Sequence, residues 1–236
     1  SFLSLPQTPQ SYRIAPYLFY NDINIERLDS TGSAEIIGDY AFLQCAFLTK
    51  AVFSEGIKEI GEGAFSGCGA LTQVTLPASL AEIGEGAFSS SCLYEVWNLS
   101  SLPVEAGGSD YGGVGKYAMF IYDSADEESR VAAEDGFIFV RDGEEWNLVA
   151  ASQTDRVYLP EDGRIGGVRI DGYALGKGFG NEGIKVLYIP MEVERVGQGA
   201  FDGCTGLTAI YYEGTEEEWL QIGGYTPSGC SIVYES

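Results

Sequence analysis

A short run of residues recurs along the chain at a constant spacing. Residues 37–42 read IGDYAF, residues 60–65 and 83–88 both read IGEGAF, and residues 196–201 read VGQGAF. The first three copies begin 23 residues apart, at Ile37, Ile60 and Ile83. A fixed period of roughly 20–50 residues is typical of stacked repeat architectures. A single unit of this length cannot bury its own apolar side chains, so the period predicts a solenoid of stacked rungs.

The rest of each unit recurs in the same frame. After the glycine-rich turn of the second copy, the apolar positions are Phe65, Cys68, Leu71, Val74, Leu76 and Leu80. Val74 and Leu76 lie two residues apart, so they face the same side of a short strand. Pro77 ends that strand because it cannot donate to a ladder. Gly61 and Gly63 allow a tight turn, and we expect rungs about 4.8 Å apart.

The full pattern, I-G-x-x-A-F-x-x-C-x-x-L-x-x-V-x-L-P, resembles the bacterial BspA-like leucine-rich repeat, also called the Treponema pallidum type. The resemblance covers residues 36–103 and 165–212 well and residues 104–164 poorly. It implies extracellular or surface-attached bacterial proteins, with adhesion or host-protein binding in some members, and no enzyme activity. We therefore predict a mainly β chain with little helix, folded as a right-handed leucine-rich-repeat solenoid with a parallel strand face.

The middle of the chain departs from the 23-residue period. Asp142 and Gly143 stand between two β-rich runs, 136–140 and 146–149, which predicts a β-hairpin. We expect residues 104–164 to form an irregular repeat with this hairpin inserted. The alternative is a separate small β domain near residues 104–160.

Both ends of a solenoid need a cap. Residues 1–35 are interpreted as an N-terminal cap or a degenerate first rung, and residues 213–236 as the C-terminal cap. Thr215 and Glu218 form a capping box, so we expect a short helix whose Trp219 covers the last rung. A closing strand is expected near residues 232–234.

The charge balance disfavours several partners. The chain has 35 acidic and 13 basic residues, a formal charge of −22, and no histidine. Such a field repels phosphate backbones and anionic lipid, so we expect no nucleic-acid partner. No run approaches the roughly 18 apolar residues of a membrane span, so we expect no membrane insertion. The chain starts at Ser1 without Met, and an upstream segment, such as a signal peptide, is expected.

The cysteines share one position of the repeat. Cys45, Cys68 and Cys204 occupy the same column, and Cys92 lies one residue late. We favour buried free thiols, with a disulfide between Cys45 and Cys68 as the alternative, because neighbouring rungs suit its geometry. Cys230 lies outside the column and is the candidate reactive thiol.

Catalysis and metal binding have little support in the sequence. Acidic residues cluster at Asp123, Asp126, Glu127 and Glu128, at Glu134 and Asp135, at Asp142, Glu144 and Glu145, and at Glu161 and Asp162. None of these clusters has the spacing of a calcium loop, so we interpret them as solvated loops. Serine and cysteine have no histidine to activate them. We predict no catalytic residues, no metal and no cofactor.

The outward positions of the strands suggest a binding surface. Between the buried strand residues lie Trp97, Tyr158, Tyr188 and Tyr211, which would form an aromatic stripe on the strand face. Aromatic side chains of this kind are favoured in recognition surfaces. The alternatives are that they only stack to stabilise the sheet, or that the 104–160 insertion buries them.

These features together predict a monomeric, non-enzymatic binding or adhesion module at the bacterial cell surface or outside the cell. It would recognise a protein or glycan through the strand face. A structural spacer within a larger surface protein is the alternative, and a carboxylate-dependent enzyme is a third, weaker interpretation.

Overall fold

In the computed structural model, the chain forms two compact units, Ser1–Ser129 and Arg130–Ser236, each of which is described by itself. The structure describes residues 1–134, 136–151, 155–161, 164–165, 168–169, 172–176 and 182–235. Asp135 and Asp162 of the acidic clusters lie outside the described residues. The region expected as one irregular repeat, 104–164, is divided between the two units.

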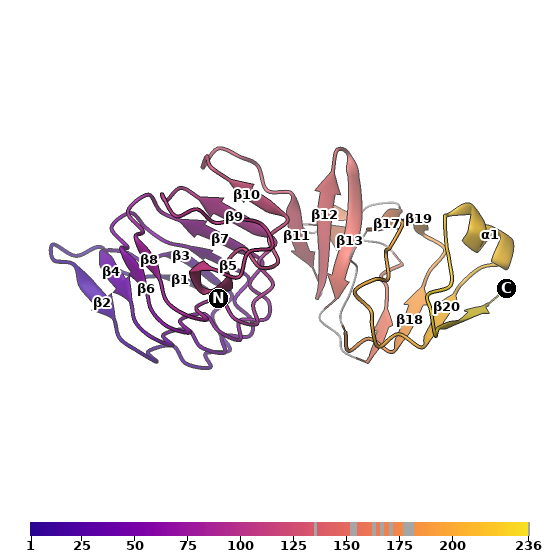
Figure 1. Cartoon of the computed structure of the whole chain (residues 1–236), viewed down its shortest axis with the longest axis horizontal. Coiled ribbons are helices and arrows are strands. Elements are labelled where there is room, and N and C mark those ends of the chain that lie inside the picture. The colour runs from indigo at the N-terminus through magenta and orange to yellow at the C-terminus, as the bar shows by residue number, and fades with distance from the viewer. Residues whose placement is uncertain are drawn as a thin grey trace. The chain divides into compact units, whose positions relative to one another are not determined.

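Unit 1 is built from two parallel sheets whose strands alternate along the chain as far as β9 (Figure 1). The six-stranded sheet contains, in order, β1 (Phe2–Ser4), β3 (Arg27–Ser30), β5 (Lys50–Val52), β7 (Gln73–Leu76), β9 (Glu95–Asn98) and β10 (Phe120–Tyr122). The four-stranded sheet contains β2 (Tyr12–Ile14), β4 (Ala34–Ile37), β6 (Glu59–Ile60) and β8 (Glu82–Ile83). A short 3-10 helix, η1, spans Tyr111–Gly113. Lys50 pairs with Gln73 and Ile37 with Ile60, so each rung is one 23-residue repeat.

A column of phenylalanine rings fills the interior of unit 1. Phe19, Phe42, Phe65 and Phe88 stack with successive ring centroids 4.8, 5.0 and 5.4 Å apart. The last three are buried, as is the alanine that precedes each of them. The small alanine lets neighbouring backbones approach while the ring fills the rung. The predicted solenoid of parallel strands is confirmed.

The turn before each phenylalanine requires a left-handed backbone. Gly63 and Gly86 have φ of 56° and 61° there, a region that glycine enters at no steric cost. In the first two rungs the same position is occupied by Tyr17 and Tyr40, with φ of 58° and 57°. A residue with a Cβ atom is disfavoured in this conformation by roughly 1–2 kcal/mol. The backbone conformation therefore disfavours tyrosine at both of these positions.

Unit 2 combines a hairpin with further parallel rungs. Its five-stranded sheet contains, in order, β11 (Val131–Glu134), β12 (Phe137–Asp142), β13 (Glu145–Ala151), β17 (Tyr173–Leu175) and β19 (Val193–Val196). Its four-stranded sheet contains β14 (Arg156–Tyr158), β18 (Val186–Ile189), β20 (Ala209–Tyr212) and β21 (Ser231–Tyr234), all parallel, and β15 (Arg164–Ile165) pairs with β16 (Val168–Arg169). β12 and β13 are antiparallel around Gly143, so the predicted hairpin is confirmed.

The two ends of the chain differ in how they are closed. The helix α1 (Glu216–Gln221) begins with the predicted capping box of Thr215 and Glu218. Its Trp219 is buried, and the ring centroids of Trp219 and Phe201 lie 6.4 Å apart. At the other end, β1 and β2 pair in parallel with β3 and β4, so the first residues follow the path of a rung. No helix among the described residues is long and apolar enough to cross a membrane.

We expect Phe65→Ala to destabilise unit 1 by about 3–5 kcal/mol, because it leaves a cavity between two stacked rings. Phe47, which is exposed, provides the control: Phe47→Ala should change stability by no more than about 0.5 kcal/mol. Urea unfolding followed by circular dichroism measures both. Equal effects of the two substitutions would contradict the stacked core.

Candidate binding surface

Three tyrosines form a ladder on the outward side of unit 2. Tyr158 pairs with Tyr188, and Tyr188 with Tyr211, in the register of β14, β18 and β20. Their rings are nearly parallel: the centroids of Tyr158 and Tyr188 lie 4.1 Å apart at 6°, and those of Tyr188 and Tyr211 4.8 Å apart at 16°. The structure therefore brings together three of the four residues predicted from the sequence.

The ladder follows from the alternation of side chains along each strand. Val157, Leu187 and Ile210, which precede the tyrosines in their strands, are fully buried. Successive side chains of a strand point to opposite faces, so burying these residues directs the tyrosines outward. Tyr158, on the edge strand of the sheet, is 58% exposed.

Stacking limits what the tyrosines can offer to a partner. The central ring of Tyr188 has a neighbouring ring on each face, so it presents only its edge and its hydroxyl group. A hydrogen bond with the hydroxyl of Tyr158, together with burial, raises the pKa of Tyr188. The hydroxyl groups of Tyr158 and Tyr188 are therefore linked.

The outward positions within the strands of the ladder are mostly apolar and include no carboxylate. The outward positions of the four strands are Arg156, Tyr158, Val186, Tyr188, Ala209, Tyr211, Ser231 and Val233. None of these eight residues is acidic, although the chain contains 35 acidic residues. We call this surface the tyrosine face. An apolar patch on so acidic a chain is the kind of surface that marks an interaction site.

The fourth predicted residue, Trp97, lies in unit 1 and is only 6% exposed. The ring of Tyr122 on β10 packs against it at 5.0 Å, and its indole N–H donates to the backbone oxygen of Glu127 at 3.2 Å. The prediction that Trp97 faces solvent is therefore wrong. It is buried under part of the 104–160 insertion, which was one of the alternatives.

The segment that covers Trp97 is held in place by Glu95, whose role was not predicted from the sequence. Its side chain is fully buried and accepts hydrogen bonds from the Tyr122 hydroxyl at 2.9 Å, the Ser129 hydroxyl at 2.7 Å and the Gln73 amide at 3.0 Å. A buried carboxylate needs such donors to offset its desolvation. Residues 122–129 are thereby fixed across β9.

Cys45 and Cys68 of the cysteine column are free thiols, as are Cys92 and Cys230. Cys45 and Cys68 are buried and donate to the carbonyl oxygens of Phe19 and Phe42, at 3.1 and 3.2 Å. Burial raises the pKa of Cys230, which reduces its thiolate fraction and hence its reactivity.

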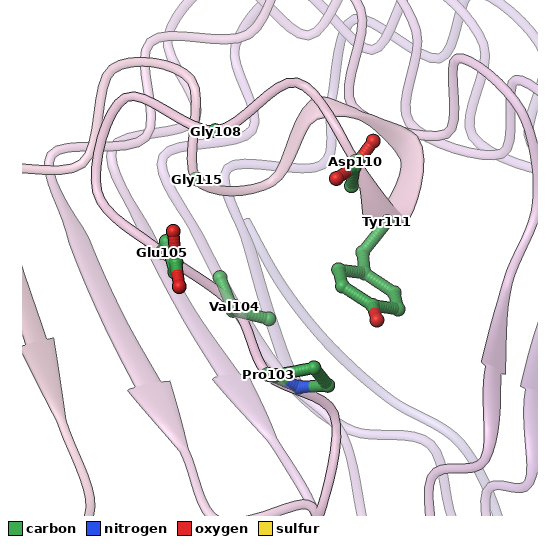
Figure 2. Close-up of a pocket in the computed structure, with 7 residues that line it drawn as sticks. All are labelled: Pro103, Val104, Glu105, Gly108, Asp110, Tyr111 and Gly115. Carbon is green, nitrogen blue, oxygen red and sulfur yellow. The ribbon is translucent and has the colours of Figure 1, made fainter.

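The described residues show little that could bind a small ligand or a metal. Among them, no group of three or more His, Cys, Asp or Glu residues is placed to hold a metal ion. A pocket of about 240 Å³ lies beneath the loop that contains Gly108 and Gly115. Figure 2 shows the Tyr111 ring extending toward Val104 and Pro103, with Glu105 at the rim. Acidic side chains without a cation or a second polar partner do not define a site, so the tyrosine face is the better candidate.

Comparisons with known proteins define the family. The model of the BspA type leucine rich repeat region matches the chain in six copies, over residues 8–104 and 176–234. This is well over half of the chain. The first matched region extends beyond the predicted 36–103 at both ends, and the second begins later than the predicted 165–212 and ends later. The chain therefore belongs to the BspA type leucine rich repeat family. No curated protein sequence matches it.

Three similar solved structures are bacterial leucine-rich-repeat proteins. The T. pallidum leucine rich repeat protein is 20% identical, over 86% of this chain and 76% of that one, with a TM-score of 0.31. A leucine rich cell surface protein of Faecalibacterium prausnitzii is 16% identical, over 91% and 86%, with a TM-score of 0.25. A leucine-rich repeat protein of Bacteroides ovatus is 19% identical, over 95% of this chain and 59% of that one, with a TM-score of 0.37.

We expect Tyr158→Phe to lower the pKa of Tyr188 toward the ordinary tyrosine value of about 10, because the variant keeps the stacked ring but removes the hydroxyl partner. Tyr211→Phe is the matched control and should change this pKa much less. A pH titration of the tyrosine ring signals by NMR measures both. An unchanged Tyr188 pKa in Tyr158→Phe would show that the hydroxyl groups are not linked.

Proposed function

We propose that the chain is a non-enzymatic binding module that recognises a protein through the tyrosine face. The observation that carries this proposal is the outward ladder of Tyr158, Tyr188 and Tyr211, among strand positions that include no carboxylate. Tyrosine is enriched among the residues that dominate binding energy in protein interfaces. A rigid stacked ladder also loses little side-chain freedom on binding, which favours affinity.

The stacking favours a protein over a glycan as the partner. Sugar recognition by aromatic residues uses an open ring face, whereas both faces of the Tyr188 ring are covered by its neighbours, at 4.1 and 4.8 Å. The ring edges, the hydroxyl groups and the small side chains of Val186 and Ala209 remain available to a partner. This combination suits the apolar side chains and backbone groups of a protein surface.

We also propose that the protein acts at the bacterial cell surface or outside the cell, as the BspA type family suggests. The spacer interpretation requires the tyrosines only to stabilise the sheet by stacking. It differs from the proposed function in predicting no partner for the tyrosine face.

The test is binding to two arrays, one of extracellular-matrix and plasma proteins and one of glycans. We expect a protein partner, and we expect Tyr158→Ala combined with Tyr211→Ala to weaken its binding about thirtyfold or more, since an aromatic hot spot contributes about 2 kcal/mol. Tyr117→Ala is the control, because Tyr117 is exposed in unit 1.

Circular dichroism of each variant confirms that it folds. Full binding by the folded double variant would refute the role of the tyrosine face. Binding to glycans alone would refute the choice of a protein partner, and the absence of binding on either array would favour the spacer.

A further inference from the structure

The tyrosine ladder of unit 2 holds two phenol rings at a distance from which they can react with each other. The centroids of Tyr158 and Tyr188 lie 4.1 Å apart, with only 6° between the ring planes. The two residues are Cα partners in the parallel pair β14 and β18, so their side chains leave the sheet in the same direction. The ring carbons next to the two hydroxyl groups, the Cε atoms, therefore lie beside one another.

Stacking keeps these two rings in place. Tyr188 is enclosed between Tyr158 and Tyr211, and the centroids of Tyr188 and Tyr211 lie 4.8 Å apart at 16°. Val157 and Leu187, which precede the first two tyrosines in their strands, are fully buried and anchor both strands. Two reactants held in this way meet far more often than two that are free in solution.

The pair is open to an oxidant and has no competing sulfur group among its strand neighbours. Tyr158 is 58% exposed. The other outward positions of the four strands carry arginine, valine, alanine, serine and tyrosine side chains, and none of them is a thiol or a thioether. Such sulfur groups would reduce a tyrosyl radical before it could couple. Among these positions, a radical on Tyr158 therefore has the ring of Tyr188 as its nearest reaction partner.

The other pairs of stacked tyrosines are placed less well for coupling. Tyr17 and Tyr40 have centroids 5.1 Å apart at 19°, and the hydroxyl of Tyr40 is hydrogen-bonded to Glu62. Among the described residues, Tyr158 and Tyr188 have the smallest separation between two tyrosine rings.

We propose that Tyr158 and Tyr188 are a site of oxidative cross-linking, at which a peroxidase that uses hydrogen peroxide joins the two rings into dityrosine. The link would connect β14 covalently to β18, across two rungs of unit 2. The reaction needs no binding partner, so it is independent of the proposed binding function.

The reaction balances with hydrogen peroxide as the oxidant. Each phenol loses one electron and its hydroxyl proton, and one molecule of peroxide takes up both electrons and both protons to give two molecules of water. The two tyrosyl radicals then form a carbon–carbon bond between their Cε atoms. Each of these carbons gives up its proton to the oxygen of its own ring, which restores both phenols. The protein loses two hydrogen atoms in total.

The test is to treat the whole folded chain, at high dilution, with a heme peroxidase and hydrogen peroxide. Dityrosine fluorescence gives the yield, and mass spectrometry of proteolytic peptides gives the linked residues. We expect a monomeric product in which Tyr158 is joined to Tyr188. Tyr188→Phe keeps the stacked ring but removes the phenol that both ladder pairs share, so it should lower the yield about tenfold or more. Tyr158→Phe should move the link to Tyr188 and Tyr211. Tyr117→Phe, which changes an exposed tyrosine of unit 1, is the matched control and should leave the ladder link unchanged.

Four results would overturn the proposal. They are a main product that joins two molecules, a main link between Tyr17 and Tyr40, an unchanged yield in folded Tyr188→Phe, and oxidation of Cys230 without coupling of the rings. Each of these results leaves the proposed binding function untouched, because that function is tested by partner binding to the alanine variants without any oxidant.

Discussion

The stacking of one aromatic ring per rung is the interaction on which unit 1 depends. The rings of Phe19, Phe42, Phe65 and Phe88 lie 4.8–5.4 Å apart, close to the spacing of hydrogen-bonded strands. A ring can contact the next only if the intervening chain completes one turn. The stacking therefore fixes the register of 23 residues, and each further column of the repeat, such as Glu35 beside Lys58 at 3.2 Å, follows from it.

This register converts a sequence pattern into a surface. A residue type that recurs at one position of the repeat becomes a continuous row on the folded unit. Tyr188 and Tyr211 are 23 residues apart, and their rings touch. The tyrosine face is a product of this rule.

Local signals explain why much of the fold could be predicted. The hairpin follows from Asp142 and Gly143, and the helix from Thr215 and Glu218, since each of these signals acts over a few residues. The outward direction of Tyr158, Tyr188 and Tyr211 follows equally from alternation along a strand.

The burial of Trp97 could not be predicted in the same way. Alternation gives the face of the sheet on which a side chain lies, but not the segment that crosses that face. The segment over Trp97 follows β10, lacks the repeat pattern and is held by Glu95, a residue that the pattern places outward. The left-handed backbone of Tyr17 could not be predicted either. The sequence shows that tyrosine takes the place of glycine there, but it does not show the φ angle of that tyrosine.

Disulfide trapping across the rungs tests the stacked register most directly. Glu35, Lys58 and Ala81 lie in one column, with Lys58 N–H donating to Glu35 and Ala81 N–H to Lys58. Cysteines at 35 and 58, or at 58 and 81, should be within the roughly 4.4–6.8 Å that a disulfide spans, and should couple under mild oxidation. Cysteines at 35 and 81, two rungs apart, should not. Equal coupling of all three pairs, or of the 35 and 81 pair alone, would contradict the 23-residue rung.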